Sequence, residues 1–503
     1  MILKFMNIQQ ASFYLWVLAL FLCLVAPSLL SDGMFVDGVT YAAISNNLAH
    51  GMGSFWDLHY TQTLYPHFHE HPPLAFGLQG LFFSWFGSSY LVERFFSLAT
   101  FLFTGWILVL TWNRITGGRW TGLGWLPLLF WITVPLVSWA ASNNLLENTM
   151  MIFTSLSVFF IFQSRVSHRI LFLCLAGVSL FLGTLTKGFV SLFTLTLPAW
   201  MWIFGKAYPI RRAATDTMIF VLTLLLPFLV IFLIMPESLE SLRAYLETQV
   251  LNSLRNVRTV DTRFYIVWRL FLELLPGLAL IGLLYIVTGK RDLERARGSM
   301  ARILIALGLS GVLPVMISLK QRGFYIQATF PIFALALAIL AAPRVQYLVD
   351  KLKTGSRGEA VIRIGAPLLL LVSIFLNSLQ INRIGRDREL IGDIRKIIAT
   401  VPRGSNLAVS KELWENWALH AYLQRYAGIS PDSDRQVSAP YLLKSKGADG
   451  ELPEGYIKDA VELNGYKLYT RAVIRKNGET TGKDLSNSLF ARRIVIPVHL
   501  NGR

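Results

Sequence analysis

Long apolar runs recur along the chain from residue 11 to residue 379 and are separated by short polar segments. A helix rises 1.5 Å per residue, so about 20 apolar residues cross the roughly 30 Å hydrocarbon core of a bilayer. We therefore predict an all-α polytopic membrane region with eleven transmembrane helices. The expected spans cover residues 11–30, 91–112, 120–138, 145–163, 169–185, 188–204, 215–235, 264–288, 301–319, 324–342 and 361–379.

The first run resembles a signal peptide without its cleavage pattern. It follows a single basic residue, Lys4, and no A-x-A sequence stands near Ser31. Signal peptides that are removed carry such a site. We interpret residues 11–30 as a retained signal anchor.

Two segments between the first and second expected spans are predicted to be interfacial helices. Residues 72–86 are apolar but reach only about 22 Å as a helix, which is too short to span. In residues 37–48, apolar side chains recur at helical spacing, at Tyr41, Ile44 and Leu48, and the other face is polar. We expect this second helix to lie on the membrane surface.

The composition agrees with an integral membrane protein. Of 503 residues, 54% are hydrophobic and only 15% are charged, and the mean hydropathy is +0.50. An ordinary soluble domain is about 25% charged, and disordered chains lack this much Phe and Leu. The two cysteines, Cys23 and Cys174, lie inside apolar runs and indicate neither a disulfide nor a cysteine metal site.

The basic residues indicate how the chain is oriented. If residues 72–86 do not span, the loops on one side carry 18 Lys and Arg, and those on the other side carry seven. Cytoplasmic loops are the more basic ones. The outer face then holds the first loop, residues 31–90, which has no Lys or Arg, and a further long loop, residues 236–263.

A change of composition near Leu379 predicts two domains. Residues 1–380 hold 27 Lys and Arg and 16 Asp and Glu, whereas the much shorter stretch 381–503 holds 20 and 14. We expect a membrane domain over 1–380 and a small α/β domain outside the membrane over 381–503. Its expected elements are a helix at 388–399, a strand at 406–410, a helix with Trp414, Trp417, Tyr422 and Tyr426, and strands at 472–474 and 494–498.

Two acidic residues of the first outer loop stand in unlike settings. Asp37 opens the expected surface helix, where it can cap the N-terminus or serve as a base. Glu70 lies within the run His67-Phe68-His69-Glu70-His71. Such a run can bind a divalent metal, hydrogen-bond a phosphate or form a simple polar turn. Its alternate histidines would share one side only if the segment is extended.

Cations are rare on the outer face and therefore informative. Lys187 and Lys320 occupy tight connections between spans, and Arg255 and Arg258 lie in the loop 236–263. They can snorkel to lipid headgroups or cradle an anionic phosphate. Glu147 opens a span and can be an ion-pair partner or a residue at a helix end.

Several of these residues fall into a known pattern. Asp37 with Tyr41, then Glu70-His71-Pro72-Pro73-Leu74, and later Leu185-Thr186-Lys187-Gly188 and Lys320 through Tyr325 to Pro331 occur in this order. The pattern resembles GT-C glycosyltransferases of family 39, and most of all the bacterial aminoarabinose transferase (ArnT-like) group. Protein O-mannosyltransferases are more distantly similar. The resemblance covers about the first 340 residues.

The resemblance implies an inverting transfer of a sugar from a polyprenyl-phosphate donor, undecaprenyl phosphate, on the periplasmic face of a bacterial inner membrane. The acceptor would be a lipid, a glycan or a protein. It implies that Asp37 is the catalytic base and that Glu70 is the second catalytic residue. It implies no nucleotide cofactor. The residues expected at the donor phosphate are His71, Lys187, Arg255, Arg258, Lys320 and Tyr325.

This sequence departs from the family pattern at three places, one of which is Tyr325-Ile326-Gln327-Ala328, where the family has YxLP. His71 stands where ArnT-like proteins have a lysine, and residues 236–263 lack the histidine that, with a glutamate and a tyrosine, holds a metal in that group. Glu70 and Tyr325 match the other two ligands. A divalent metal, Zn or Mg/Mn, would then need Glu70, His69 and His71.

A transporter or flippase of a lipid-linked sugar is the alternative from another class. Such proteins are commonly built from paired repeats with broken helices near the bilayer midplane. The sequence shows no internal repeat, and its ionisable residues gather at one face. The pattern therefore favours an enzyme.

Overall fold

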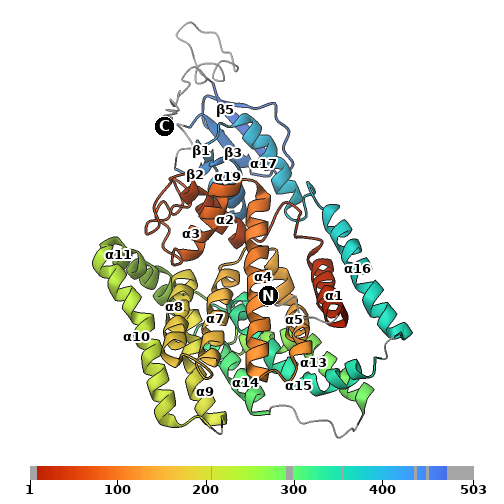
Figure 1. Cartoon of the computed structure of the whole chain (residues 1–503). Coiled ribbons are helices and arrows are strands. Elements are labelled where there is room, and N and C mark those ends of the chain that lie inside the picture. Colours follow the sequence, from red (N-terminus) through yellow and green to blue (C-terminus); the bar gives the residue numbers. More distant parts are fainter. Residues whose placement is uncertain are drawn as a thin grey trace, which may run out of the picture. The chain divides into compact units, whose positions relative to one another are not determined.

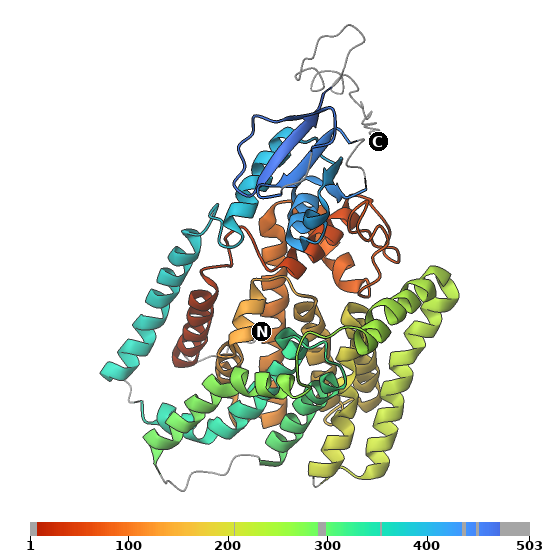
Figure 2. The same ribbon diagram turned by 180° about the vertical axis from the view of Figure 1, so that it is seen from behind.

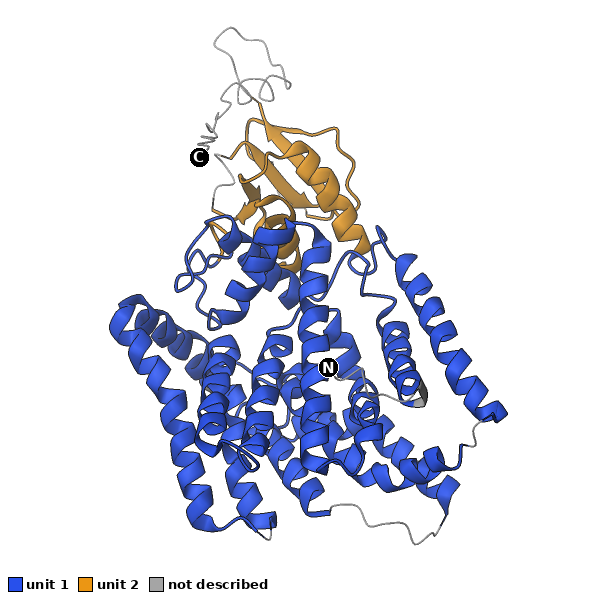
Figure 3. Cartoon of the chain, viewed as in Figure 1, with its two compact units in different colours: residues 1–60, 65–387 blue, residues 61–64, 388–503 orange. Residues whose placement is uncertain are grey.

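The computed structural model describes residues 8–205, 207–289, 298–352, 355–434, 439–448 and 452–472. The chain divides into two compact units (Figure 3), of which unit 1 comprises residues 1–60 and 65–387 and unit 2 comprises residues 61–64 and 388–503. Some predicted features lie outside the described residues. They are the strand at 494–498, residues 473 and 474 of the strand at 472–474, and the basic residues Lys4, Lys206, Lys290, Arg291, Arg295, Arg297 and Lys353.

Unit 1 is helical (Figure 1). Its elements are α1 (Ile8–Val25), α2 (Val36–Ala49), α3 (Leu74–Phe86), α4 (Tyr90–Thr116), η2 (Thr121–Leu123), α5 (Trp125–Ile132), α6 (Pro135–Ala141), α7 (Leu146–Gln163), α8 (Arg169–Lys187), η3 (Gly188–Thr196), α9 (Leu197–Phe204), α10 (Ile210–Ile234), α11 (Pro236–Tyr245), η4 (Leu246–Leu251), α12 (Asn252–Arg255), α13 (Tyr265–Thr288), α14 (Gly298–Val312), η5 (Leu313–Ile317), η6 (Gly323–Thr329), α15 (Phe330–Asp350) and α16 (Arg357–Ser378).

The number of spanning helices differs from the prediction. Among the described residues, eight helical stretches are long and apolar enough to cross a membrane, or nine if α5 and α6, which meet at 87°, form one bent span. The prediction of eleven is therefore not confirmed. The apolar part of the first helix, Gln10–Val25, is too short by this measure, and Arg169–Phe204 counts as one stretch.

The chain nevertheless reverses direction within Arg169–Phe204. Thr184 Oγ1 lies 3.0 Å from Ser191 Oγ, whereas seven residues of straight helix would separate them by about 10 Å. The reversal occurs at Gly188, which has a φ of +74°. Helices α8 and α10 run parallel to each other, so η3 and α9 return across the unit. Two contacts fix that direction: Arg169 Nε donates to Asp216 (2.7 Å), and Phe181 packs on Phe228.

Some helices of unit 1 face outward with apolar side chains, and others form its core. In the apolar windows of α10 and α16 only 11% of residues are buried, against 89% for Gly323–Asp350. Apolar side chains exposed over a whole helix are typical of contact with lipid. Inside, Phe101 of α4 stacks on Trp131 of α5 with ring centroids 4.0 Å apart.

Helices α1 and α16, at the two ends of unit 1, lie side by side (Figures 1 and 2). Trp16 Nε1 donates to the Ile362 carbonyl (3.0 Å), and Asn377 Nδ2 donates to the Leu22 carbonyl (3.0 Å). These pairs show that the two helices run parallel. The last helix of unit 1 therefore ends at the same face as the first.

The two short helices of the first outer loop behave differently from each other. Helix α3 is apolar and too short to span, as predicted. Helix α2 forms where expected, but nine of its 14 residues are buried, including the polar residues Thr40, Ser45 and Asn47. The polar residues of α2 are thus largely buried rather than facing solvent. The polar side chains are satisfied inside the protein, since Ser45 Oγ donates to the Tyr41 carbonyl (2.8 Å) and Asn47 Nδ2 to the Tyr60 carbonyl (2.7 Å).

Unit 2 is a small α/β unit with a mixed five-stranded sheet in the order β2-β1-β3-β5-β4. Strand β1 pairs parallel with β2 and β3, and β5 pairs antiparallel with β3 and β4. Its elements are α17 (Arg388–Thr400), β1 (Asn406–Val409), α18 (Lys411–Trp414), α19 (Trp417–Ala427), β2 (Ser430–Asp432), β3 (Tyr441–Ser445), β4 (Tyr456–Lys458) and β5 (Tyr466–Arg471).

A short piece of the first loop belongs to unit 2. The Gln62 amide donates to Ser430 Oγ (3.0 Å), and Thr63 Oγ1 donates to the Pro431 carbonyl (2.5 Å). Residues 61–64 therefore complete the side of the sheet at β2.

Candidate active site

Asp37 is the second residue of α2, and the N-cap residue is Phe35. Asp37 is thus not the helix cap, although a carboxylate in the first turn suits the helix dipole. The Phe35 amide donates to Asn143 Oδ1 (2.8 Å), and Asn144 Nδ2 donates to the Gly38 carbonyl (3.0 Å). These bonds hold the start of α2, and with it Asp37, against the connection between α6 and α7.

Asp37 is half-buried among other charged groups. Burial raises the pKa of its carboxyl above the usual value, and nearby cations oppose that rise only in part. A raised pKa makes a carboxylate a better proton acceptor near neutral pH. The opposing cations, in order of effect, are Lys187, Arg322 and Lys320.

Lys187 and Glu147 form a buried ion pair. Lys187 Nζ lies 2.6 Å from Glu147 Oε1, and the two side chains are 7% and 0% exposed. Lys187 also lies 5.8 Å from the ring centroids of Phe324 and Tyr325. The pair joins the end of α8 to the start of α7, and the Tyr325 ring lies near it. Glu147 is therefore an ion-pair partner, as one of its two sequence interpretations proposed. Lys187 is buried and does not extend to the lipid headgroups.

Lys320 lies in the connection between η5 and η6 and is held by two neutral oxygens. Its Nζ donates to Gln249 Oε1 (3.1 Å) and to Ser253 Oγ (3.0 Å). Burial lowers the pKa of Lys320, while the negative charge of Glu70 acts in the opposite direction. The outer loop thus holds the ammonium in place, where the charges of Glu70 and Asp37 act on it.

Glu70 and His71 are adjacent in sequence but have separate partners. Burial raises the pKa of Glu70, and both Lys320 and a hydrogen bond from the Tyr65 hydroxyl oppose the rise. His71 Nε2 lies 3.2 Å from the Tyr41 hydroxyl. Burial lowers the pKa of His71 well below its usual value, so the imidazole is neutral. It can exchange a hydrogen bond but does not supply positive charge.

The structure brings together most, but not all, of the residues predicted for the site. Asp37, Glu70, His71, Lys187, Lys320 and Tyr325 influence one another electrostatically. Arg255 and Arg258 are exposed in the outer loop, and Arg258 pairs with Asp261 at 3.2 Å. Arg322 acts on Asp37 and was not among the residues expected at the donor phosphate. Its position two residues after Lys320 was the sequence feature that could have identified it.

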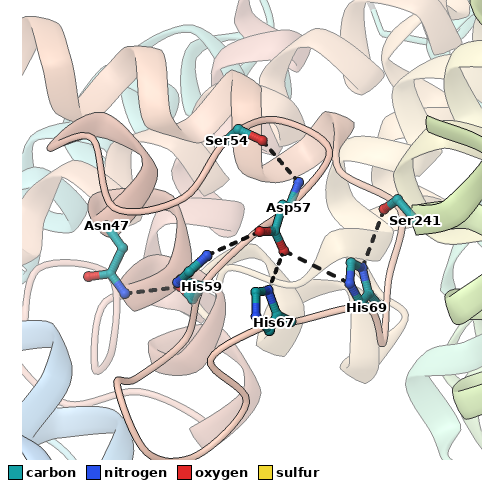
Figure 4. Close-up of polar contacts among 7 residues, drawn as sticks. All are labelled: Asn47, Ser54, Asp57, His59, His67, His69 and Ser241. Carbon is teal, nitrogen blue, oxygen red and sulfur yellow. Dashed lines mark hydrogen bonds and ion pairs between the residues drawn. The ribbon is translucent and has the colours of Figure 1, made fainter. Parts of the chain in front are cut away.

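The metal ligands expected from the sequence do not assemble into one set. Glu70 faces Tyr65 and Lys320, His71 faces Tyr41, and His69 Nε2 lies 3.9 Å from Asp57 Oδ1. Residues 236–263 offer no histidine in place of a third ligand. Glu70, His69 and His71 therefore do not fit a shared metal ion. Another group of metal-type side chains does come together nearby, at Asp57, His59 and His67 (Figure 4).

Comparison with known proteins identifies the fold. No family model matches the chain, and no curated protein matches it. Two crystal structures of ArnT from Cupriavidus metallidurans are similar at 14% identity. The one bound to undecaprenyl phosphate has a TM-score of 0.62 and covers 91% of this chain and 97% of ArnT. The apo state has a TM-score of 0.60 and covers 90% and 96%.

The apo oligosaccharyltransferase of Archaeoglobus fulgidus is also similar, with a TM-score of 0.54 and 10% identity. The match covers 88% of this chain and 70% of that protein. At these identities the likeness concerns the fold. It confirms the GT-C architecture that the sequence resemblance implied, while the assignment to family 39 stays a prediction. The chain therefore has the GT-C fold of ArnT.

Proposed function

We propose that this chain is an inverting membrane glycosyltransferase that moves a sugar from a polyprenyl-phosphate donor to a lipid, glycan or protein acceptor. The observation that carries the proposal is the carboxylate of Asp37, whose pKa is raised by burial and on which the charges of Lys187, Arg322 and Lys320 act. A base and a group of cations are the two things that this transfer requires.

The proposed chemistry is a single displacement. The acceptor oxygen bonds to the anomeric carbon while the bond from that carbon to the phosphate oxygen breaks. Asp37 takes the acceptor proton, and the electron pair leaves with the lipid phosphate. One displacement at the anomeric carbon inverts its configuration. Glu70 carries a second carboxyl near the same site, coupled to Asp37 by charge.

The departing phosphate needs fixed positive charge to stabilise it. Among the described residues, no ion pair joins Lys320 or Arg322 to a carboxylate, so both are available to an anionic ligand. Lys187 already neutralises Glu147 in an ion pair, and its charge also acts on Asp37. We therefore assign the donor phosphate to Lys320 and Arg322, with Tyr325 beside them.

Two observations support a lipid-linked donor. The structure of ArnT with the same fold was solved with undecaprenyl phosphate bound. We also find no nucleotide-binding pattern such as G-x-G-x-x-G or a Walker motif in the sequence. The excess of basic residues on the opposite side supports a site on the periplasmic face of a bacterial inner membrane.

Sugar transfer in membranes tests the proposal. Membranes that contain the natural chain receive a radiolabelled pool of undecaprenyl-phosphate sugars, and transfer is compared with Asp37→Asn at matched expression. Asp261→Asn is the matched control, because that carboxylate is fully exposed in the outer loop. We expect Asp37→Asn alone to lose transfer. Unchanged transfer would remove Asp37 from the chemistry, and no transfer by the natural chain from any sugar would favour a transporter.

A further inference from the structure

A group of four metal-type side chains in the first outer loop is separate from the proposed active site. It consists of Asp57, His59, His67 and His69, and we call it the His–Asp cluster (Figure 4). The sequence places its members in two alternating pairs, Asp57-Leu58-His59 and His67-Phe68-His69. Because side chains alternate along an extended chain, each pair can present both members on one face.

The backbone realises this arrangement. Leu58 and Phe68 pair as an antiparallel bridge, and the Phe68 amide donates to the Leu58 carbonyl (2.6 Å). The Leu58 and Phe68 side chains are 2% and 3% exposed. Since these two point into the protein, their neighbours on both strands point the other way. The His–Asp cluster thus lies on one side of this bridge.

The donor atoms already lie close together around Asp57. His67 Nδ1 is 2.8 Å from Asp57 Oδ1, and His59 Nε2 is 3.3 Å from Asp57 Oδ2. The ligand atoms of these three residues all lie within 4.8 Å of one another. Tetrahedral Zn²⁺ holds N and O ligands at about 2.0–2.1 Å, which puts the ligand atoms roughly 3.4 Å apart. Only small side-chain adjustments separate the cluster from that geometry.

Neighbouring residues fix the orientation of the cluster. Ser241 Oγ of α11 lies 3.4 Å from His69 Nδ1, which leaves Nε2 directed at Asp57. Asn47 Nδ2 donates to the His59 carbonyl (3.1 Å), and Ser54 Oγ accepts from the Asp57 amide (3.2 Å). A partner on the second ring nitrogen, as Ser241 is for His69, is typical of the outer shell of a metal site, and the other two bonds hold the backbone of His59 and Asp57.

The site is open to an entering ion. The side chains of His67 and Asp57 are 65% and 43% exposed, whereas those of His59 and His69 are 27% and 23% exposed. The more exposed ligands, His67 and Asp57, can therefore capture an ion from solvent. The less exposed ones, His59 and His69, can hold it from the protein side. Imidazole-rich sites with one carboxylate suit Zn²⁺ and similar divalent transition metals.

We propose that Asp57, His59 and His67, with His69 as the fourth ligand, form a binding site for a divalent transition metal of the Zn²⁺ type. The ion would hold together the two segments that meet at the Leu58–Phe68 bridge and, through His69 and Ser241, connect them to α11. This assignment differs from the Glu70, His69 and His71 set expected from the sequence. It also stands whether or not the chain transfers sugars.

Metal binding by the full chain in detergent tests the proposal. The chain is purified through a tag without histidine, treated with a chelator, and titrated with Co²⁺, whose visible absorption bands report its coordination. We expect one Co²⁺ per chain with a tetrahedral spectrum, displaced by Zn²⁺. The double variant His59→Ala, His67→Ala should lose the spectrum and bind at least 100-fold more weakly.

Three single variants make the test selective. His50→Ala is the matched control, because His50 lies in the same loop and its ring Nδ1 lies 2.7 Å from the Asn46 carbonyl oxygen, away from the His–Asp cluster. His71→Ala separates the His–Asp cluster from the set expected from the sequence. Both should bind Co²⁺ as the natural chain does. Ser241→Ala should bind about 10-fold more weakly, since it removes an orienting partner but no ligand.

Two outcomes would overturn the proposal. One is a natural chain that elutes as a single species and yet binds no stoichiometric Co²⁺ or Zn²⁺. The other is binding that survives in the double variant but is lost in His71→Ala. Asp57→Asn guards against a folding artefact, because the amide keeps the shape of the side chain. It should elute normally and still bind more weakly than His50→Ala.

Discussion

Two opposing influences act on Asp37. Burial disfavours its charged form, and the cations around it favour that form, with burial prevailing. The result is a carboxylate that holds its proton to a higher pH than a free aspartate, whose pKa is about 4. Only the deprotonated form can accept a proton from an acceptor hydroxyl.

The pH dependence of transfer follows from this. As the pH falls through the raised pKa of Asp37, the base is protonated and the rate should fall tenfold per pH unit. The fall should begin at a higher pH than a free carboxylate would give. Initial rates of transfer between about pH 4 and pH 8 measure it, with Asp261→Asn expected to keep the profile. A rate that stays constant down to about pH 4 would show that Asp37 is not the base.

The charge on Lys320 should matter more than that of an exposed cation. Lys320→Gln removes an ammonium aimed at the proposed phosphate site by Gln249 and Ser253, and should lower kcat/KM for the lipid donor by about 10- to 100-fold. Lys320→Arg keeps the charge and should recover part of the loss. Arg243→Gln is the control, since Arg243 is exposed and pairs with Glu247 at 2.9 Å. Equal losses in the Lys320→Gln and Arg243→Gln variants would contradict the assignment.

Residue types and spacing found much of the candidate site, but they could not show its environment. Asp37, Glu70, Lys187 and Lys320 were visible as charged residues on a face with few of them. The neutrality of His71 depends on burial, which a local sequence does not report. Asp57 and His59 were missed because they join His67 and His69 only across the bridge between Leu58 and Phe68.

At the scale of elements, the break after α8 shapes the site. Gly188 has a φ of +74°, and a Cβ atom added there would lie 2.0 Å from the Tyr245 hydroxyl oxygen. Glycine thus allows the chain to turn back and lets α11 approach Lys187, whose carbonyl accepts from the Tyr245 hydroxyl at 3.5 Å. The turn follows directly on Lys187, whose Nζ pairs with Glu147.

Gly188→Ala should therefore destabilise the fold. The left-handed backbone and the contact with Tyr245 together predict a loss of about 1–3 kcal/mol. Gly282→Ala in α13 is the control, because nothing lies within 4 Å of the added atom and the backbone is helical. The midpoint of thermal unfolding in detergent, followed by tryptophan fluorescence, compares them. Equal midpoints for the two variants would show that the turn is not constrained.

Element boundaries were predictable where periodicity or length decides them. The short helix α3 and the helices α2 and α17 occur where the apolar spacing placed them. The burial of α2 was not predictable, because its polar side chains bond to segments such as Tyr60 that lie outside the helix. Strands β2 to β5 have three to six residues each, too few for an alternating pattern to stand out.

At the scale of the whole molecule, hydropathy predicted the class of the protein better than its span count. Apolar runs show that a segment can cross a bilayer, but they do not show where a helix bends or reverses. The bend between α5 and α6 and the reversal at Gly188 are local backbone events. The assignment of residues 61–64 to unit 2 is a tertiary event and carried no sequence signal.

The orientation of the molecule in the membrane is open to a direct test. The positive-inside rule places residue 261 outside and residue 166 inside, and both positions are exposed, at 101% for the Asp261 side chain and 64% for Val166. In a chain in which Cys23 and Cys174 are replaced by serine, Asp261→Cys should react with a membrane-impermeant maleimide in intact spheroplasts. Val166→Cys should react only after the membrane is permeabilised. The reverse labelling would place Asp37, Lys187 and Lys320 on the cytoplasmic side, where a soluble nucleotide sugar becomes the more reasonable donor.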